Sequence, residues 1–395
     1  MIDKIKDNDK KYIMNTYGRY DALFVSGEGA TLTDDTGKKY IDFSSGIGVS
    51  SLGYGNAAIA EAVGNQASVL CHVSNLFYTK PMVEVARKLC SNTGFARVFF
   101  GNSGAEANEC AIKLARKYSF DKYGKDRNTI ITLVQSFHGR TVTTLSATGQ
   151  DDFHKYFFPF TGSFRNAVAN DAESLTAAVD DSVCAIMLEA IQGEGGVIPL
   201  AAEFVSEIYK IAAKHDILVI FDEVQTGIGR TGKLFGYQHF DGTPDIVTMA
   251  KGLGGGLPIG ACMCNEKLKD VLRPGDHGST FGGNPVSCAA ANVVMDTITK
   301  QAFLAAVTEK GDYIKAKLSK ANIPSVEAVK GWGLMVGIKL SKKDAKVVVK
   351  KCLEKGLVVL TAKGNVVRLL PPLVISYDEL NRGLGILINV LEEED

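Results

Sequence analysis

The stretch Asp245-Ile-Val-Thr-Met-Ala-Lys251-Gly-Leu-Gly-Gly-Gly-Leu-Pro-Ile-Gly260 joins a short β-branched run to a glycine-rich loop, with one lysine at the junction. Upstream, Ile217-Leu-Val-Ile-Phe-Asp222 is another apolar run, and it ends in a carboxylate. Short, continuous apolar runs are typical of strands buried inside a parallel sheet. We therefore predict that Lys251 and Asp222 lie at the carboxyl edge of such a sheet, where open α/β folds bind ligands.

The two residue types at these strand ends suggest a particular chemistry. A lysine at the end of a buried strand can lose its charge by desolvation and act as a nucleophilic amine. A carboxylate nearby is the partner that pyridoxal 5'-phosphate needs opposite its ring nitrogen. Taken alone, Lys251 is better explained as a surface lysine in a glycine turn. The pair together indicates an enzyme that uses this cofactor as an electron sink.

On both sides of these two segments, from about residue 55 to residue 300, the chain alternates buried strands with amphipathic helices. We expect strands over 97–100, 129–134, 183–188 and 217–222. Helical faces are marked by Ala107, Ala111 and Leu114, and later by Phe204 and Ile208. Such alternation predicts an α/β domain with a mostly parallel central sheet covered by helices on both faces.

The two ends of the chain have a different pattern. Residues 1–54 predict an N-terminal arm and a hairpin, with the turn at Asp34-Asp-Thr-Gly37. Residues 301–395 predict a small α+β domain that packs with the N-terminal segment, and its last helix precedes Glu392-Glu-Glu-Asp395. The large domain between them, 55–300, is expected to bind the cofactor.

Composition excludes some classes of function. Lysine plus arginine number 44, and so do aspartate plus glutamate, so nucleic-acid binding is disfavoured. The longest apolar runs are far shorter than the roughly 20 residues that span a bilayer, and no signal segment is visible at the N-terminus. The eight cysteines include no C-x-x-C pair and mostly lie in apolar surroundings. We expect a cytoplasmic protein with reduced, buried cysteines, bound to no membrane and no nucleic acid.

Further polar segments follow the other predicted strands. In Phe100-Gly-Asn-Ser-Gly-Ala-Glu-Ala-Asn-Glu109, a helix is expected to begin near Ser103. Its free N–H groups, with Gly104 and Ala105 leaving room, would form a phosphate cradle or else an ordinary helix cap. The sequence leaves both interpretations open.

In Gln135-Ser-Phe-His-Gly-Arg140, Phe137 can stack on an aromatic ring and Arg140 can bind a carboxylate. His138 is a possible general base, although a structural role is favoured. Glu189-Ala-Ile-Gln-Gly-Glu194-Gly-Gly follows a buried strand, which favours pocket groups over solvated loop charges.

Two glycine-rich segments resemble nucleotide-binding loops but depart from them. Gly227-Ile-Gly-Arg-Thr-Gly-Lys233 has Leu234 where a P-loop needs Ser or Thr. Gly252-Leu-Gly-Gly-Gly-Leu-Pro258 lacks the G-x-G-x-x-G spacing. The sequence also lacks the spacing of a metal site, so we predict no bound metal.

These motifs together resemble the class III (subgroup II) aminotransferases. The runs G-N-S-G-A-E-A-N-E, S-F-H-G-R, F-D-E-V-Q-T-G-I-G-R-T-G, A-K-G-L-G-G-G-L-P-I-G and H-G-S-T-F-G-G-N-P occur in that family's order, and the resemblance covers essentially the whole chain. Many relatives read E-P-[IV]-Q-G-E where this chain has Ala190 in place of proline, but Glu189 and Glu194 remain. The resemblance implies a fold-type I transferase that depends on pyridoxal phosphate and works as a homodimer with shared active sites.

The family also implies a role for individual residues. Lys251 would be the Schiff-base lysine, and Asp222 would pair with the ring nitrogen. The cofactor would be held by Ser103, Gly104, Ala105, Phe137, Asp222, Glu223, Val224, Gln225, Lys251 and, from the neighbouring subunit, Thr280. The substrates would be bound by Arg140, Ser279, Glu194, Arg368 and Ile47. Roles for His138 and Glu189 are not assigned.

Within the family, His72-Val-Ser-Asn-Leu-Phe-Tyr78 and Arg368-Leu-Leu-Pro-Pro-Leu373 resemble the branch whose amino donor is N2-acetylornithine. We therefore expect the terminal amino group of that donor to pass to 2-oxoglutarate, giving N-acetylglutamate 5-semialdehyde and glutamate, as in arginine biosynthesis. N-Succinyl-diaminopimelate is a plausible second donor. The alternatives are a transaminase for ornithine, 4-aminobutyrate or another omega-amine, or a catalytically silent regulatory protein that binds the cofactor.

Overall fold

The centre of the computed structural model is a seven-stranded sheet in the order β4-β12-β11-β10-β7-β5-β6. Residues 2–393 are described, so Met1, Glu394 and Asp395 lie outside the description. The strands are β4 (Arg97–Gly101), β12 (Gly260–Cys264), β11 (Ile246–Met249), β10 (Leu218–Asp222), β7 (Val183–Leu188), β5 (Thr129–Leu133) and β6 (Phe164–Ala167). All share one direction except β12, which is antiparallel to both neighbours. The predicted, mostly parallel sheet is therefore confirmed.

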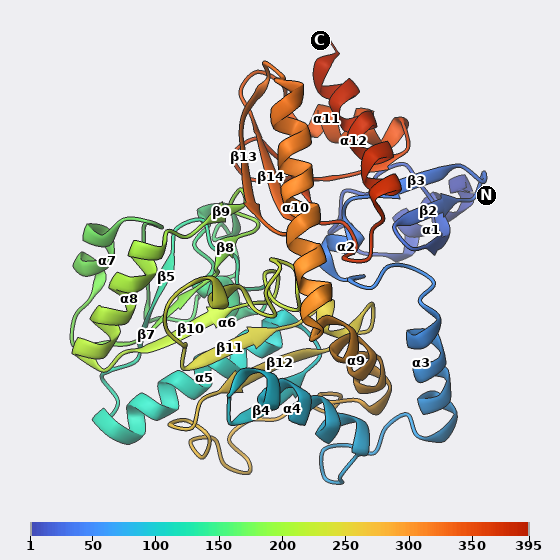
Figure 1. Cartoon of the computed structure of the whole chain (residues 1–395). Coiled ribbons are helices and arrows are strands. Elements are labelled where there is room, and N and C mark those ends of the chain that lie inside the picture. Colours follow the sequence, from blue (N-terminus) through green and yellow to red (C-terminus); the bar gives the residue numbers. More distant parts are fainter. Residues whose placement is uncertain (1, 394–395) are drawn as a thin grey trace.

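Helices cover both faces of this sheet (Figure 1). Successive strand residues point to opposite faces, and both Ile220 and Phe221 are fully buried. Ile220 packs in the cluster that contains α5 (Gly104–Tyr123), whereas Phe221 packs in the cluster that contains α8 (Ala202–His215). The other elements here are α3 (Ala57–Val69), α4 (Lys80–Thr93), α6 (Val142–Ala147), η1 (Asp151–Phe153), α7 (Ala172–Ala178), β8 (Ile191–Gln192), β9 (Ile198–Pro199), η2 (Gly236–His239), η3 (Lys251–Gly254) and α9 (Pro285–Ile298).

A second, antiparallel sheet in the order β13-β14-β17-β16 lies in the C-terminal part, above the large sheet in Figure 1. It is reached through the long helix α10, and two further helices pack with it. The elements of the C-terminal part are α10 (Gln301–Ala321), β13 (Val326–Trp332), β14 (Met335–Leu340), α11 (Ala345–Glu354), β15 (Leu357–Val358), β16 (Leu360–Ala362), β17 (Val366–Leu369) and α12 (Tyr377–Glu392).

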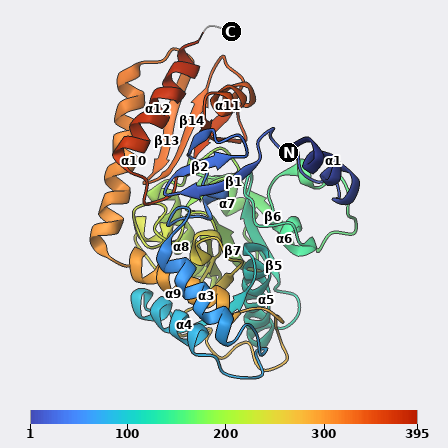
Figure 2. The ribbon, with the colours of Figure 1, turned by 90° about the vertical axis from the view of Figure 1, so that its right-hand side faces the viewer.

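The N-terminal segment packs against the C-terminal part of the chain, which adds one strand to its small sheet (Figure 2). It comprises α1 (Ile2–Tyr12), β1 (Phe24–Glu28), β2 (Thr31–Asp34), β3 (Lys39–Asp42) and α2 (Ser45–Gly48). Strands β2 and β3 form the predicted hairpin, and β15 adds to β3 in parallel, with Ile41 opposite Leu357. Phe43 and Leu384 are buried in one shared core. We propose on this basis that residues 2–54 and 301–393 form one small unit.

The segment after β3 has an unusual backbone. Ser45, Gly46, Ile47 and Gly48 have φ angles of 43°, 62°, 66° and 79°, in the left-handed region. A β-branched residue such as Ile47 rarely adopts this region, so the surroundings must hold it there. Asp42 accepts hydrogen bonds from the backbone N–H groups of Ser44 (2.7 Å) and Ser45 (2.8 Å). The turn is thus fixed at its start by a buried carboxylate.

The cysteines and the helix lengths can be compared with the sequence predictions. All eight cysteines are free; six are buried, Cys90 is half-buried and Cys71 is exposed. The prediction that the cysteines are buried is therefore confirmed for most of them and is wrong for Cys71. Over residues 2–393, the structure contains no helix that is both long enough and apolar enough to cross a bilayer.

Candidate active site

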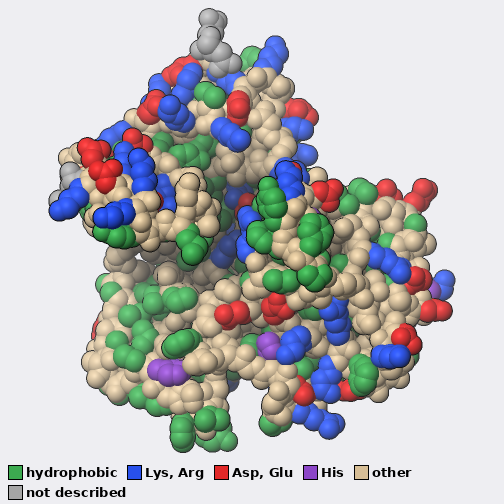
Figure 3. Space-filling view, turned by 180° about the vertical axis from the view of Figure 1, so that it is seen from behind, with side chains coloured by type: hydrophobic (Ala, Val, Ile, Leu, Met, Phe, Trp, Pro, Cys, Tyr) green, Lys and Arg blue, Asp and Glu red, His purple; other side chains and the backbone are tan. Residues whose placement is uncertain are grey.

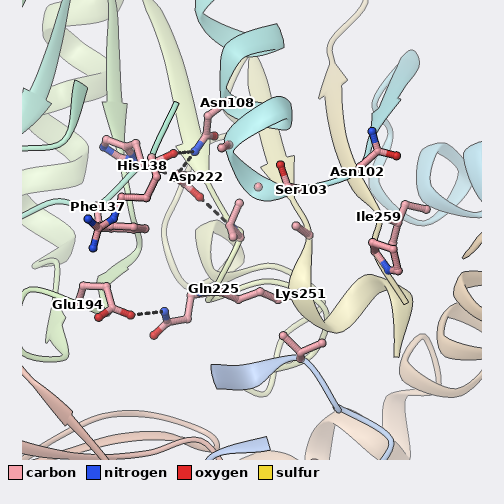
Figure 4. A pocket seen from close by; sticks show the side chains of 18 of the residues that line it. Asn102, Ser103, Asn108, Phe137, His138, Glu194, Asp222, Gln225, Lys251 and Ile259 are labelled. Atoms are coloured by element: carbon pink, nitrogen blue, oxygen red, sulfur yellow. Dashed lines mark hydrogen bonds and ion pairs between the residues drawn. The ribbon is translucent and has the colours of Figure 1, made fainter. Parts of the chain in front are cut away.

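A cavity of about 470 Å³ lies at the carboxyl ends of the central strands. Segments that follow β4, β5, β7, β10 and β11 all contribute to its wall. In the space-filling view the molecule is hollowed between its upper and lower parts, and hydrophobic side chains gather beside the hollow (Figure 3). Lys251, Asp222 and Glu194 all line this cavity, so the parallel sheet brings together residues that are distant in sequence (Figure 4).

Lys251 follows β11 directly and opens the turn η3. Its φ angle is +41°, which is uncommon for a residue with a side chain and typical of functional sites. The amine forms no hydrogen bond or ion pair with any residue among 2–393. Burial lowers the pKa of Lys251, whereas the charge of Glu194 opposes this shift. The side chain is therefore an amine without a partner in the described residues, and burial makes its neutral form more accessible than that of an exposed lysine.

Asp222 ends β10 and is 3% exposed. Its Oδ2 accepts hydrogen bonds from Asn108 Nδ2 (2.7 Å) and from His138 Nδ1 (2.8 Å), and its Oδ1 accepts from the backbone N–H of Val224 (3.0 Å). No lysine or arginine among the described residues forms an ion pair with it. A buried carboxylate held in this way keeps acceptor capacity for a cationic N–H in the cavity.

His138 supports Asp222 from behind. Its side chain is fully buried, and its backbone N–H donates to Thr148 Oγ1 at 3.0 Å. Because Nδ1 lies 2.8 Å from the carboxylate, this nitrogen carries the proton and orients Asp222. Asn108 is oriented in the same way by Thr248, whose hydroxyl donates to Asn108 Oδ1 at 2.6 Å. Asn108 lies within the Phe100–Glu109 segment, but the sequence pattern did not predict its contact with Asp222.

The start of α5 combines both interpretations that the sequence left open. Ser103 is the N-cap, and its hydroxyl accepts from the N–H of Glu106 at 3.2 Å. The N–H groups of Gly104 and Ala105 have no acceptor within residues 2–393, and both residues line the cavity. A side chain on Gly104 would meet Val224 Cγ1 at 2.7 Å, so the backbone lies close to the opposite wall. A helix end with free N–H groups binds anions.

Glu189 forms part of the floor. Its carboxylate accepts from the backbone N–H groups of Phe137 (3.0 Å) and Gly193 (3.2 Å). Burial raises the pKa of Glu189 to about 7, and the nearby charge of Asp222 adds to this shift. Glu189 therefore fixes the position of Phe137, which also lines the cavity.

On the other side of the cavity, Glu194 in the wall forms an ion pair with Arg368, a buried residue that lies behind the wall and does not line the cavity; Arg368 Nη1 is 2.7 Å from Glu194 Oε1. Gln225 contacts both partners, because its Oε1 accepts from Arg368 Nη1 (3.0 Å) and its Nε2 donates to Glu194 Oε1 (3.4 Å). Burial alone would raise the pKa of Glu194, but the charge of Arg368 lowers it overall. Glu194 is therefore ionised and neutralises Arg368.

Some of the expected residues do not line this cavity. Ile47 is 45% exposed, and Val49 is the residue of that segment that reaches the wall. Thr280 is exposed and lies outside the cavity. Ser279 reaches it only through Asn102, whose Nδ2 donates to Ser279 Oγ at 3.0 Å.

The expectation that Glu223 contacts the cofactor does not fit the geometry. Its carboxylate is fully buried and accepts from Thr226 (2.5 Å) and from the backbone N–H groups of Gly236 (2.8 Å) and Tyr237 (2.6 Å). Neighbouring residues of an extended chain point to opposite sides, and Asp222 already points to the cavity. Glu223 therefore anchors η2 instead.

Comparison with known proteins gives a consistent result. The chain matches the family Aminotransferase class-III over residues 12–391. It is 50% identical to acetylornithine aminotransferases from Caldanaerobacter subterraneus subsp. tengcongensis, over 98% of both chains, and from Haemophilus ducreyi, over 99% of both chains.

Solved structures of similar fold include ornithine aminotransferase from Toxoplasma gondii, with a TM-score of 0.95, 30% identity and coverage of 99% of this chain and 95% of that one. N-acetylornithine aminotransferase from Stenotrophomonas maltophilia has a TM-score of 0.85 and 34% identity, with 97% of each chain covered. The expected fold-type I architecture is confirmed, and the chain belongs to the class III aminotransferases.

Proposed function

We propose that this chain is a pyridoxal phosphate-dependent transaminase that moves the terminal amino group of N2-acetylornithine to 2-oxoglutarate. The products would be N-acetylglutamate 5-semialdehyde and glutamate, as in arginine biosynthesis. The observation that carries the proposal is the meeting of Lys251 and Asp222 in one cavity beside a free helix end. The relatives with 50% identity are named for this donor.

The residues present fit the cofactor. Asp222 offers a buried acceptor for a protonated ring nitrogen, and the free N–H groups of Gly104 and Ala105 offer donors for a phosphate. Lys251 offers an amine with no other partner among the described residues. Phe137, Val224 and Gln225 complete the wall on which the ring would rest. A related structure, from Toxoplasma gondii, is described with this cofactor at its active site.

When bound, the cofactor supplies an electron sink for the charge that develops on the substrate carbon. Lys251 would move the proton: its Nζ would take the proton from the amine-bearing carbon of the donor and pass it to the cofactor carbon that keeps the amino group, and its lowered pKa favours this role. Asp222 would hold the proton on the ring nitrogen of the bound cofactor, and His138 and Asn108 keep the carboxylate of Asp222 in place. Such acid–base groups contribute about 10²–10⁴-fold to the rate.

The Arg368–Glu194 pair allows two different substrates to use one cavity. Glutamate has two carboxylates, whereas N2-acetylornithine has one. We propose that Arg140 binds the carboxylate distant from the reacting carbon in both cases. Arg368 would bind the second carboxylate of glutamate, and Glu194 would neutralise Arg368 when the donor lacks that group.

The acylated donor suits the cavity wall at Val49, and neither Val49 nor the exposed Ile47 beside it in sequence carries a hydroxyl. A free ammonium placed against apolar side chains would lack a partner, whereas an acetylated nitrogen carries no charge. Ornithine is nevertheless the second candidate, because the ornithine aminotransferase from Toxoplasma gondii has a TM-score of 0.95 with this chain.

A homodimer with shared sites is also proposed. Thr280 is exposed and does not line the cavity of its own chain, as expected of a residue that acts in the partner subunit. Nearby in sequence, Phe281 is 58% exposed, and on the segment before α4 Leu76 and Tyr78 are 87% and 99% exposed. Burial of such side chains by a second copy would stabilise the dimer. The free cysteines are consistent with a cytoplasmic location.

The test is direct. Purified protein with the cofactor is incubated with 2-oxoglutarate and, one at a time, N2-acetylornithine, N-succinyl-diaminopimelate, ornithine or 4-aminobutyrate, and glutamate formation is measured. We expect N2-acetylornithine to have the highest kcat/KM. Equal or better kcat/KM for ornithine would reject the donor assignment. If no amine changes the visible absorbance of the bound cofactor, the protein is not a transaminase but a silent cofactor-binding protein.

A further inference from the structure

The guanidinium of Arg140 is held by aromatic rings alone. Its Cζ lies 4.0 Å from the centroid of the Phe153 ring and 5.6 Å from the centroid of the Phe137 ring. It forms no hydrogen bond or ion pair with any residue in the described range 2–393. Arg140 lines the cavity, so this is a cation at the site whose N–H groups are all available.

Stacking and hydrogen bonding use different parts of a guanidinium. The flat faces of the group can rest on aromatic rings, while its N–H donors point outward in the plane. A carboxylate from the protein would occupy those donors and compete with a substrate. Phe153 has no such effect, because it restricts the cation and leaves every donor free for a bidentate contact.

The ring of Phe153 is itself fixed by its surroundings. It ends the short turn η1, and its ring centroid lies 6.0 Å from that of Phe137 in an edge-on arrangement. Before the turn, Gln150 is 5% exposed, and its Nε2 donates to the backbone oxygen of Ser136 at 3.0 Å. After it, His154 Nε2 lies 2.8 Å from the backbone oxygen of Leu145. Both ends of the turn are therefore attached to the large domain.

We propose that Phe153 is a positioning residue that holds the Arg140 guanidinium by its face, so that the N–H edge is presented to the carboxylate of each substrate. This inference rests on the proposed function, in which Arg140 binds a carboxylate in both half-reactions. It predicts that loss of the ring weakens binding of the donor and of 2-oxoglutarate alike. The proton transfer by Lys251 does not involve Phe153, so kcat should change little.

The experiment uses the full-length protein loaded with its cofactor and the unreactive dicarboxylate glutarate. The dissociation constant of glutarate is measured by calorimetry, and KM and kcat are measured for both substrates. We expect Phe153→Leu and Phe153→Ala to weaken glutarate binding and raise both KM values by roughly 3- to 5-fold, the upper range of a cation–π contact at an exposed site, because Arg140 is itself exposed. Phe153→Tyr and Phe153→Trp, which keep a ring, should restore values within about 2-fold of wild type.

Phe158→Ala is the matched control. Phe158 belongs to the same loop and is 72% exposed, and the centroid of its ring lies 4.8 Å from that of the Phe160 ring. This variant should leave glutarate binding and both KM values unchanged. Unaltered cofactor absorbance and circular dichroism in each variant would show that the fold is retained.

A double-mutant cycle separates this inference from the proposed function. If Phe153 acts through Arg140, Phe153→Leu should have no further effect in an Arg140→Ala background. An undiminished effect in that background, or an effect on kcat alone, would overturn the positioning role. If Arg140→Ala itself leaves glutarate binding intact, the proposed role of Arg140 is wrong. If Arg140→Ala weakens binding but neither Phe153→Leu nor Phe153→Ala does, only the inference about Phe153 is wrong.

Discussion

Glu194 Oε1 lies 2.7 Å from Arg368 Nη1, and Gln225 contacts both side chains. The pair joins a loop of the large sheet to a strand of the C-terminal sheet, because Arg368 lies on β17. Neutralisation of Arg368 by Glu194 therefore depends on how these two parts of the chain are arranged around the cavity.

Replacement of Glu194 by Gln should change substrate preference in a defined direction. With no counter-ion, Arg368 would favour substrates with a second carboxylate and would disfavour those with one. We expect the ratio of kcat/KM for glutamate to that for N2-acetylornithine to rise roughly 10-fold. Steady-state kinetics of the two half-reactions would measure this, with Arg368→Ala expected to shift the ratio the other way. An unchanged ratio in both variants would contradict the proposal that Arg368 pairs with Glu194 for one substrate and with the second carboxylate of glutamate for the other.

Replacement of Asp222 by Asn should keep the size of the side chain but remove its charge. The ring nitrogen would no longer be held in its protonated form, so we expect transamination to fall by roughly 10²–10³-fold while cofactor still binds. Stopped-flow absorbance of a single half-reaction gives the rate, and absorbance of the bound cofactor gives occupancy. Near-normal rates would mean that Asp222 has only a structural role.

Thr280 should act across the subunit boundary. Mixing inactive Lys251→Ala protein with a Thr280→Ala variant should produce hybrid dimers in which one site has both residues intact. After random subunit exchange, about one quarter of wild-type activity should return. Each variant mixed with itself is the control. Exchange that is verified by mass spectrometry but restores no activity would place the complete site within one chain.

A single change at Ile47, two residues before Val49 in the cavity wall, tests donor choice. Ile47→Tyr adds a hydroxyl that can accept a hydrogen bond from the free ammonium of ornithine. It also removes β-branching at a φ angle of 66°, so the backbone should tolerate the change. We expect kcat/KM for ornithine relative to N2-acetylornithine to increase roughly 10-fold. If the ratio does not move, position 47 does not contact the donor.

Glu223 should make stability depend on pH. Burial raises the pKa of Glu223 to about 7 in the folded protein. In the unfolded chain the group ionises near its ordinary pKa of about 4.3, so the folded state is the one that keeps the proton between these values. Stability therefore falls as pH rises from about 4 to about 7 and then levels off. Glu223→Gln should remove this loss, so its melting temperature relative to wild type should be higher at pH 8 than at pH 5 by about 2–5 °C. An equal difference at both pH values would contradict the raised pKa.

The central residues of the site could be predicted because the carboxyl ends of parallel strands meet at one edge. Asp222 ends a buried strand, Lys251, Glu189 and Glu194 come after one, and the structure places all four around one cavity. The side chain of Glu223 could also have been placed correctly, because residues in an extended chain alternate in direction.

Other features depend on contacts that sequence patterns do not encode. Strand β12 is short and apolar like its neighbours, so nothing in its residues indicates that it runs antiparallel between β4 and β11. The contact of Phe153 with Arg140 arises from the path of a loop, not from any periodicity. The role of Thr280 requires a second copy of the chain, which one sequence does not place.

The parallel pairing of β3 with β15 has a consequence for how the protein is made. Strand β3 is among the first elements to leave the ribosome, but β15 comes from the opposite end of the chain. The backbone oxygen of Val358 also accepts from the N–H of Phe43, and the N–H of Leu370 donates to Phe43. The nascent N-terminal hairpin therefore lacks one edge partner until synthesis is almost finished, since such long-range pairing forms late. The large sheet can assemble earlier, so Lys251 would be in place before the segment after β3, which supplies Val49 to the cavity wall. The newly made enzyme therefore becomes competent only when its two ends meet.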